Sequence, residues 1–384
     1  MNPARVMFLA GEASGDAHAA EIARLLMLKQ PELQISGMGS TEMIKAGIDV
    51  FFDSSIIAVV GLFEVLRHWR DIRRAMAIVR ERMRQTRPDL LVLVDYPEFN
   101  LRIARHAKAL GIPVLFYISP QVWAWRPKRI HKIGRLIDHM AVIFPFETQY
   151  YEKAGIPVSF VGHPLVGKVK PGARASTMRS LLGISADARV IGLFPGSRQS
   201  EIRHLLPLMF ATARRMRAQD ASLRFVLPVA ATLNYDEILQ QARDSGADIC
   251  VTRDDLYDVI LSCDAIVTCS GTVTLEIALL GVPMCIVYRI SPLSFQIMKR
   301  LLTIPHISLV NIVAQREVVR ELLQGDANPE AVSRELQRLL GDSNYRATIG
   351  EGLDTVRRNL GSGNGAQNMA ELVLSLLPAA KAET

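Results

Sequence analysis

The sequence lacks the features on which membrane-spanning, secreted and disulfide-linked proteins depend. No stretch of about 18 residues is free of charged side chains, so no segment is predicted to span a membrane. The apolar stretch near the N-terminus is too short for a secretory signal and fits a buried strand better. The four cysteines form no C-x-x-C pair, which disfavours zinc and disulfides and indicates buried free thiols in a reducing cytosol.

Several ligand-binding signatures are also missing. The sequence contains neither the G-x-G-x-x-G of dinucleotide-binding folds, nor the Walker A phosphate loop, nor the H-E-x-x-H of zinc proteases. A D-x-D pair, with which many sugar transferases hold a metal ion on a diphosphate, does not occur either. We therefore expect neither a metal ion nor a cofactor, and a bound diphosphate would have to be neutralised by helix N-termini and cationic side chains.

The composition indicates a folded protein of two domains with a basic first half. The chain has 384 residues, about half of them hydrophobic, and a net charge of +7. Such a charge suits nucleic acid, an anionic membrane or a small anionic substrate. The basic residues concentrate in segments 67–87 and 123–135, each of which could also be a solvated helix face. Because the second half has no such segment and no nucleic-acid motif occurs, we expect no nucleic-acid partner.

Short apolar runs alternate with segments of helical spacing along most of the chain. The runs predicted as strands are 6–10, 33–38, 90–94, 114–118, 140–144 and 158–161, then 190–194, 223–228, 248–251, 264–268 and 284–288. A stretch rich in Gly, Lys and Pro at 167–175 separates the two series. We predict the α/β class, with two doubly wound, Rossmann-like domains facing each other across a cleft. The expected domains are 1–168 and 169–344, with helices at 345–384 that could return to the first domain.

Small polar turns between strands and helices are the first candidate binding sites. They contain Ser14 and Gly15 in the first half, and Gly196, Ser197, Arg198, Ser270, Gly271 and Thr272 in the second. Backbone N–H groups at a helix start bind phosphate, and the Arg198 guanidinium can grip two phosphate oxygens at once. Glu276 follows one turn into a helix, where its carboxylate could accept a hydrogen bond from a sugar hydroxyl. The alternatives are ordinary capped turns and a surface ion pair between Arg198 and Glu201.

Asp95 is the candidate catalytic residue. It follows the continuous apolar run 90–94, and ligands of open α/β sheets bind at the carboxyl ends of the strands. A carboxylate there can act as a general base if burial or neighbouring charges raise its pKa. The alternative is a helix N-cap. The loop that begins at Ser119, with Trp123, Trp125 and several cations, is suited to a sugar phosphate or a lipid headgroup.

The stretch Ile56–Phe63 is strongly apolar and is followed by Trp69 and by several arginines within Arg67–Arg74. An apolar patch with a rim of Arg and Trp suits an anionic membrane surface or an acyl chain. The alternative is a core strand that leads into a surface helix.

Six motifs, in this order, resemble those of the lipid-A-disaccharide synthase family, which are glycosyltransferases of the GT-B architecture. They are Ala10–Asp16, Asp95–Asn100, Ser119–Arg126, Pro195–Arg198, Ser270–Thr272 with Glu276, and Ser308–Asn311. The resemblance covers nearly the whole chain. Tyr96 and Glu98 depart from the family's usual D-A-P-D-F-N, so the resemblance implies no role for Glu98, whereas the first acid is present as Asp95.

The resemblance implies the reaction and its participants. A UDP-linked 2,3-diacylglucosamine would pass its sugar, with inversion, to 2,3-diacylglucosamine 1-phosphate, in lipid A biosynthesis. Asp95 would be the base, the turn residues and Arg198 would stabilise the leaving diphosphate, Glu276 would hold the ribose, and Asn311 would bind substrate. Members of the family work in the cytoplasm, attached peripherally to the inner membrane, and a homodimer is possible. A UDP-N-acetylglucosamine 2-epimerase has the same fold and is the alternative, although it would not need the apolar stretch at Ile56–Phe63.

Overall fold

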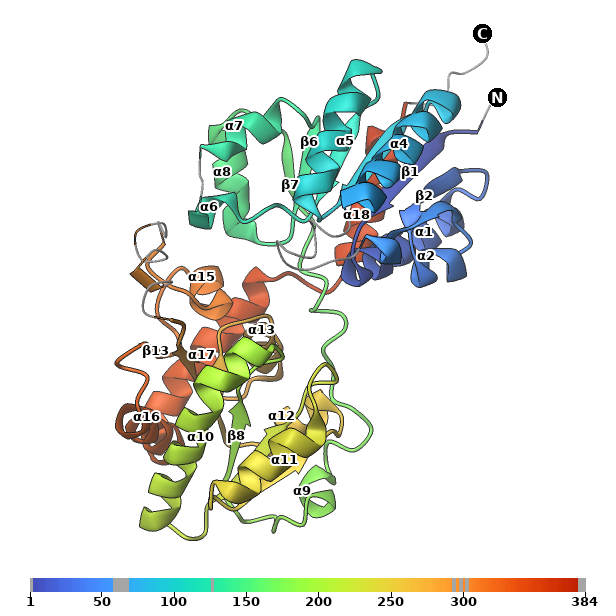
Figure 1. Cartoon of the computed structure of the whole chain (residues 1–384). Helices are drawn as coiled ribbons and strands as arrows, with labels where there is room; N and C mark the ends of the chain where they lie inside the picture. The colour runs from blue at the N-terminus through green and yellow to red at the C-terminus, as the bar shows by residue number, and fades with distance from the viewer. Residues whose placement is uncertain are drawn as a thin grey trace. The chain divides into compact units, whose positions relative to one another are not determined.

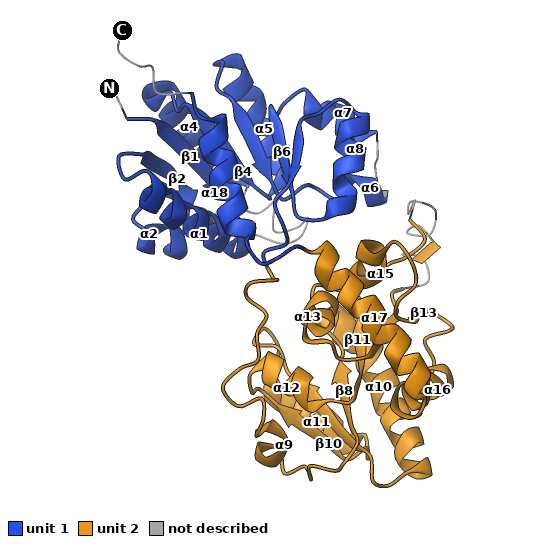
Figure 2. Ribbon diagram, turned by 180° about the vertical axis from the view of Figure 1, so that it is seen from behind, with its two compact units in different colours: residues 1–164, 361–384 blue, residues 165–360 orange. Residues whose placement is uncertain are grey.

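The computed structural model describes residues 3–57, 69–125, 128–291, 295–296, 300 and 304–378. The chain forms two compact units, each of which contains a parallel β-sheet with helices packed against it (Figures 1 and 2). Unit 1 consists of residues 1–164 and 361–384, and unit 2 consists of residues 165–360. The predicted α/β class and parallel sheets are therefore confirmed.

The sheet of unit 1 has the strand order β3-β2-β1-β4-β5-β6-β7, and every pair is parallel. The strands are β1 (Arg5–Ala10), β2 (Gln34–Gly39), β3 (Asp49–Asp53), β4 (Leu90–Val94), β5 (Val114–Tyr117), β6 (His139–Val142) and β7 (Val158–Phe160). The order reverses between β1 and β4, which is the point where doubly wound sheets bind ligands. Asp95 directly follows β4, so it lies at this point.

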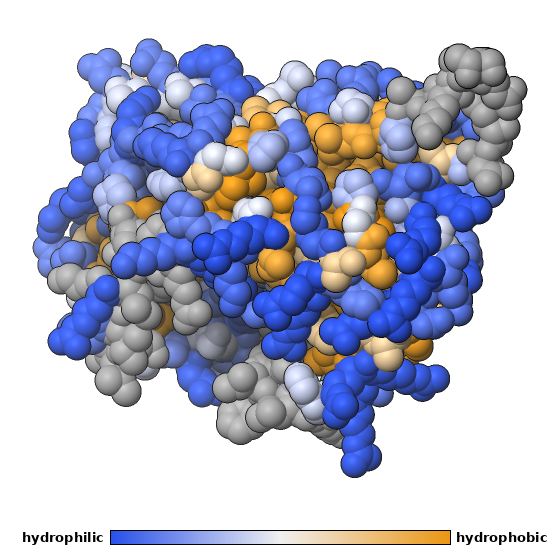
Figure 3. Space-filling model, turned by 90° about the horizontal axis from the view of Figure 1, so that it is seen from above, coloured by the Kyte–Doolittle hydropathy of each residue, from blue (hydrophilic) through white to orange (hydrophobic). Residues whose placement is uncertain are grey.

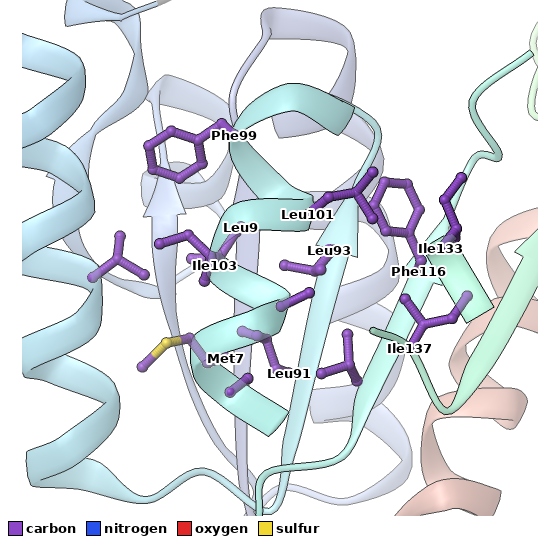
Figure 4. Packing of buried hydrophobic residues seen from close by; sticks show 14 of the residues in the cluster. Met7, Leu9, Leu91, Leu93, Phe99, Leu101, Ile103, Phe116, Ile133 and Ile137 are labelled. Carbon is purple, nitrogen blue, oxygen red and sulfur yellow. The ribbon is translucent and has the colours of Figure 1, made fainter. Parts of the chain in front are cut away.

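The helices of unit 1 cover both faces of its sheet. They are α1 (Ala13–Lys29), α2 (Thr41–Lys45), α4 (Trp69–Thr86), α5 (Pro97–Ala109), α6 (Val122–Trp125), α7 (Arg129–Gly134), α8 (Thr148–Lys153) and α18 (Gly365–Leu376), with single 3₁₀ turns at Ser54–Ile56 and Pro145–Glu147. All of β4 is buried, as a strand covered on both faces must be. Figure 4 shows Leu91 and Leu93 of β4 packed with Phe99 and Ile103 of α5.

Unit 2 repeats the arrangement with the strand order β10-β9-β8-β11-β12-β13. Its strands are β8 (Val190–Phe194), β9 (Arg224–Pro228), β10 (Ile249–Thr252), β11 (Ala265–Cys269), β12 (Met284–Tyr288) and β13 (Glu321–Leu323). Its helices are α9 (Met178–Leu181), α10 (Gln199–Gln219), α11 (Tyr235–Asp244), α12 (Leu256–Ser262), α13 (Val273–Leu280), α15 (Leu309–Ala314), α16 (Pro329–Gly341) and α17 (Ser343–Asn359). The order reverses between β8 and β11, so the turns that follow these two strands lie at the ligand-binding edge.

The C-terminal helices divide between the units differently from the expected return of 345–384 to the first domain. α17 packs on α13, α15 and α16, and the Arg357 guanidinium donates to the Leu279 carbonyl at the end of α13, 2.5 Å away. These contacts keep α17 in unit 2. Only α18 joins unit 1, where it packs on α1 and Glu371 pairs with Lys29 at 3.0 Å.

All of the strands expected from apolar runs occur, and the described residues contain two further strands, β3 and β13, that were not expected. β3 begins and ends with an aspartate and pairs with β2 through an irregular register, so its sequence gives little apolar signal. β13 is three residues long and contains Glu321, which binds backbone N–H groups of residues 307 and 308. Short edge strands of this kind cannot be recognised from apolar runs.

Candidate functional site

Asp95 lies where the backbone turns sharply from β4 into α5. Asp95 and Tyr96 both have left-handed backbone conformations, with φ of +47° and +48°. Such conformations cost about 1–3 kcal/mol each in residues other than glycine and persist only where the surroundings impose them. Here the Asp95 N–H donates to the Tyr117 carbonyl at 2.9 Å, and the Asn100 side chain donates to the Asp95 carbonyl at 2.7 Å. These two bonds hold the Asp95 side chain at the switch point of unit 1.

The surroundings of the Asp95 carboxyl raise its pKa to about 6. Burial is the main cause, the negative charge of Glu12 adds to it, and a hydrogen bond with the Tyr96 backbone opposes it. A carboxyl group with this pKa is mostly ionised at neutral pH and is still a stronger base than an ordinary aspartate. The structure thus meets the condition under which Asp95 can take a proton from a hydroxyl group.

The two departures from the family motif have separate structural explanations. The ring of Tyr96 lies against Gly11, where a Cβ atom would come within 2.2 Å of it, and the Tyr96 hydroxyl donates to the Ile57 carbonyl at 3.0 Å. Glu98 is exposed and pairs with Arg129 of α7 at 2.7 Å. Glu98 is therefore engaged in a surface ion pair, and Tyr96 fills the space that Gly11 leaves.

Ser14 and Gly15 lie inside α1 and not in a turn before it, which corrects the expectation. The helix begins at Ala13, so both residues belong to its first turn. Ser14 is exposed, whereas Gly15 is buried beside Ala10 and Val94. The first turn of a helix still presents free backbone N–H groups, so the anion-binding potential remains, although Gly15 itself serves close packing.

In unit 2, the turns after β8 and β11 line one pocket of about 610 Å³. The predicted residues on its wall are Gly196, Ser197, Arg198, Ser270, Gly271, Thr272 and Glu276. The volume is within the range of about 300–1,000 Å³ that small-molecule sites occupy. The parallel strands therefore bring together residues that are some 75 positions apart in the chain, as the sequence predicted.

The turn at Gly196 already holds one carboxylate, that of Glu201. Glu201 Oε2 accepts hydrogen bonds from the Ser197 and Arg198 N–H groups at 3.0 and 3.1 Å, and Oε1 pairs with the Arg198 guanidinium at 3.3 Å. The Arg198 side chain is 76% exposed, and exposed pairs of this kind contribute under about 1 kcal/mol. The turn thus binds an anionic group, and the ion pair with Glu201 holds the Arg198 side chain only weakly.

The turn at Ser270 combines a fixed hydroxyl with an open backbone. The Ser270 hydroxyl donates to the Ile307 carbonyl at 2.9 Å. Apart from the chain neighbours of Gly271, no described residue has an atom within 4 Å of the position that a Cβ would take there. Glu276 faces the same pocket, and its carboxylate accepts a hydrogen bond from the Tyr257 hydroxyl at 3.2 Å. Burial raises the pKa of Glu276.

Asn311 does not have the substrate contact that was expected of it. It is fully buried, and its oxygen accepts from the N–H groups of Val318 and Val319 at 2.7 and 3.0 Å. Its nitrogen donates to the Val319 carbonyl and to Glu321, each at 2.8 Å. All four hydrogen-bonding positions of the amide are occupied, so Asn311 fixes the chain between α15 and β13 and has none left for a substrate.

The loop at Ser119 conceals a buried carboxyl group that the sequence did not indicate. Trp123 is 3% exposed, and its indole N–H donates to Glu147 at 3.0 Å. The Ser119 hydroxyl lies 2.7 Å from the hydroxyl of Tyr151. Burial raises the pKa of Glu147 to about 7. Trp123 is therefore part of the core, which corrects its expected role as a surface for ligands.

Part of the predicted membrane-binding stretch, residues 58–63 and Arg67, lies outside the described residues. At its two ends, Ile56 is 50% and Trp69 45% exposed. Arg70, Arg73 and Arg74 are exposed on α4, whose opposite face is buried. Figure 3 shows hydrophobic areas on one face of the molecule, with hydrophilic side chains around them. Among the helices in the described residues, none has the length and apolar character needed to cross a membrane.

Comparison with known proteins decides between the two families that share this fold. The family model for lipid-A-disaccharide synthetase matches residues 6–374. The chain belongs to the lipid-A-disaccharide synthase family. A lipid-A-disaccharide synthase of Geobacter sulfurreducens is 47% identical over 373 residues, which are 97% of this chain and 97% of the relative. Family membership makes the chain a glycosyltransferase of lipid A biosynthesis and confirms the resemblance of the six motifs.

Solved structures confirm the fold and leave the assignment of the chain to its family unchanged. The UDP-GlcNAc 2-epimerase of Neisseria meningitidis superposes with a TM-score of 0.62 at 12% identity, over 97% of this chain and all of the other. The glycotransferase of kitacinnamycin superposes with a TM-score of 0.64 at 14% identity, over 98% of this chain and all of the other. Epimerases and transferases thus share the GT-B fold, and the sequence family favours the transferase over the epimerase.

Replacing Asp95 tests its assignment as the base. Asp95→Asn should lower turnover by roughly 10²–10⁴-fold, because the amide cannot accept the proton. Its affinity for UDP and its melting temperature should stay close to those of the unsubstituted protein. Initial rates, calorimetry with UDP and thermal melting measure the three quantities. Asp49→Asn, which alters an exposed carboxyl at the start of β3, is the matched control and should keep full activity. Turnover near the original in Asp95→Asn would refute the assignment.

Proposed function

We propose that the enzyme transfers 2,3-diacylglucosamine from UDP to the 6-hydroxyl of 2,3-diacylglucosamine 1-phosphate. The products are the β-1′,6-linked disaccharide 1-phosphate and UDP. The observation that carries this proposal is the half-buried Asp95, with a pKa near 6, at the switch point of unit 1 in a chain of this family. An α-linked donor and a β-linked product require inversion, and therefore a single displacement.

In that displacement one bond forms as another breaks. The acceptor oxygen attacks the anomeric carbon of the donor, its proton passes to the Asp95 carboxylate, and the bond from the anomeric carbon to the diphosphate oxygen breaks. The negative charge then rests on UDP. Asp95 can take the proton because its pKa is raised while it remains mostly ionised at neutral pH.

The pocket of unit 2 is the proposed site of the UDP part of the donor. The diphosphate would lie at the turns after β8 and β11, where backbone N–H groups and Arg198 line the pocket. The N–H groups of Ser197 and Arg198 bind the carboxylate of Glu201, so this turn can hold an anionic group, and a diphosphate would take the place of that carboxylate. Glu276 would accept hydrogen bonds from the ribose hydroxyls. Donors fixed in advance at a leaving group contribute on the order of 3–4 kcal/mol each when measured by removal.

A direct assay tests the proposed reaction. We expect purified protein, mixed with the two acylated sugars, to release UDP and one equivalent of disaccharide, whose anomeric proton should report the β configuration by NMR. The rate should survive excess EDTA, because cationic side chains and N–H groups are proposed to neutralise the diphosphate. A retained α configuration, an epimerised sugar nucleotide, or a loss of activity that Mg²⁺ restores would contradict the mechanism.

Arg198 offers a test of the donor site alone. Arg198→Ala should weaken UDP binding and slow transfer together, because the leaving diphosphate gains charge in the transition state. Arg198→Lys should recover only part of the loss, since an ammonium group cannot grip two oxygens as a guanidinium does. Calorimetry with UDP and initial rates measure both effects, with Arg215→Ala on the exposed face of α10 as control. Unchanged affinity and rate in Arg198→Ala would leave this residue with only its surface ion pair.

We also propose that Ile56–Phe63 and Arg67–Arg74 bring the enzyme to an anionic membrane, where acylated substrates reside. Each basic residue near such a surface contributes about 1 kcal/mol, and salt screens it. Flotation with anionic vesicles should show binding that weakens as salt rises, and changing Arg67, Arg70, Arg73 and Arg74 to Ser should abolish most of it. Changing Arg215, Arg243, Arg320 and Arg334 to Ser alters the charge equally and should preserve flotation. Equal flotation of the two variants would rule out this surface as the membrane-binding site.

A further inference from the structure

The Glu276 carboxylate accepts a hydrogen bond from Tyr257, a residue that does not line the pocket. The Tyr257 hydroxyl donates to Glu276 Oε1 at 3.2 Å, from α12 to the neighbouring helix α13. Among the residues that the structure describes, no other donor bonds to this carboxylate. Leu256, the residue before Tyr257, lines the pocket, whereas Tyr257 itself stands outside it. The tyrosine therefore contacts the carboxylate and leaves the pocket free for a ligand.

The helix that carries Tyr257 is fixed at both of its ends. At the start of α12, Asp255 accepts hydrogen bonds from the N–H groups of Tyr257 and Asp258 at 3.0 and 3.2 Å. The buried Asp258 accepts from the Arg174 N–H at 3.1 Å, and the Arg179 guanidinium donates to the Ser262 carbonyl at 3.0 Å. A tyrosine on so constrained a helix can hold a flexible glutamate side chain in one orientation.

The bond has a consequence for how many ligand groups Glu276 can bind. An ionised carboxylate has two oxygens with about four acceptor positions, and Tyr257 occupies one of those on Oε1. The Tyr257 hydroxyl keeps its proton at neutral pH, because burial and the Glu276 charge raise its pKa to about 12. Since Tyr257 remains a donor, Glu276 is kept as an acceptor that lines the pocket, and its Oε2 accepts no hydrogen bond from the residues that the structure describes.

We propose that Tyr257 is a positioning residue that orients Glu276 and thereby makes the pocket select ribonucleotides over deoxyribonucleotides. This inference rests on the proposed function, in which Glu276 accepts hydrogen bonds from the ribose of a uridine diphosphate. A carboxylate fixed in one orientation can meet the ribose hydroxyls without ordering its own side chain at the moment of binding. A site built to bond a hydroxyl group discriminates strongly against the ligand that lacks it.

The test compares UDP with 2′-deoxy-UDP and 3′-deoxy-UDP by calorimetry. The original protein should prefer UDP over at least one deoxy analogue by roughly tenfold or more, and Glu276→Gln should lose most of that preference. Tyr257→Phe should reduce the preference by about fivefold. The loss should come chiefly from weaker binding of UDP, with little change in the affinity for the deoxy analogue. In steady-state assays the KM for the donor should rise while kcat stays nearly constant, because the ribose contact is the same in ground and transition states.

A matched control comes from the same unit. The Tyr345 hydroxyl donates to Glu335 at 2.7 Å, away from the residues that line the pocket, so Tyr345→Phe removes an equivalent bond without touching the site. It should leave the preference for UDP unchanged. Tyr257→Phe removes one oxygen from a half-buried side chain, so it should melt within a few degrees of the original protein, and melting curves check this.

The outcomes separate this inference from the proposed function. If Glu276→Gln loses the preference and Tyr257→Phe keeps it, Tyr257 does not position Glu276 and the inference is overturned, while the donor site stands. If the original protein shows no preference for UDP over either deoxy analogue, Glu276 does not bind the ribose, and both the ribose assignment and the inference fail. A reduced preference in Tyr257→Phe, with Tyr345→Phe unchanged, supports the inference.

Discussion

The burial of one carboxyl group at the carboxyl end of β4 is the constraint on which the proposed chemistry depends. Asp95 lies there because β4 is a central strand with an apolar sequence, and the chain must turn away from the sheet after Val94. The turn requires a left-handed backbone at Asp95, and the bond from Asn100 to the Asp95 carbonyl holds it. Burial then raises the pKa of the carboxyl, with the charge of Glu12 as a second cause. Fold and basicity therefore have a common origin.

Features of the fold and the site that follow from general rules could be predicted from the sequence. The run Leu90–Val94 predicted a central strand because only a strand covered on both faces is continuously apolar. The grouping of Arg198, Ser270 and Glu276 in one pocket followed because parallel strands end at the same edge of a sheet. Each of these predictions rested on a local pattern or on the geometry of a parallel sheet.

The parts that depend on contacts between distant segments could not be predicted. The pairing of Trp123 with Glu147 and of Tyr257 with Glu276 requires two segments to meet in space. Trp123 and Glu276 stood out in the sequence, but their partners Glu147 and Tyr257 did not. Asn311 matched a family motif, yet its amide is used entirely within the chain, which only the structure could show. A motif indicates that a residue matters and does not say whether it meets the substrate or holds the backbone.

The pH dependence of kcat/KM tests the central claim most directly, because it reports the pKa of the base in the free enzyme. We expect an acid limb with a midpoint near pH 6, since Asp95 must be ionised to act and its pKa is about 6. In Glu12→Gln the limb should move to lower pH, because the like charge that helps to raise this pKa is removed. A midpoint near the ordinary aspartate value of about 4, or a limb that Glu12→Gln leaves in place, would contradict the account.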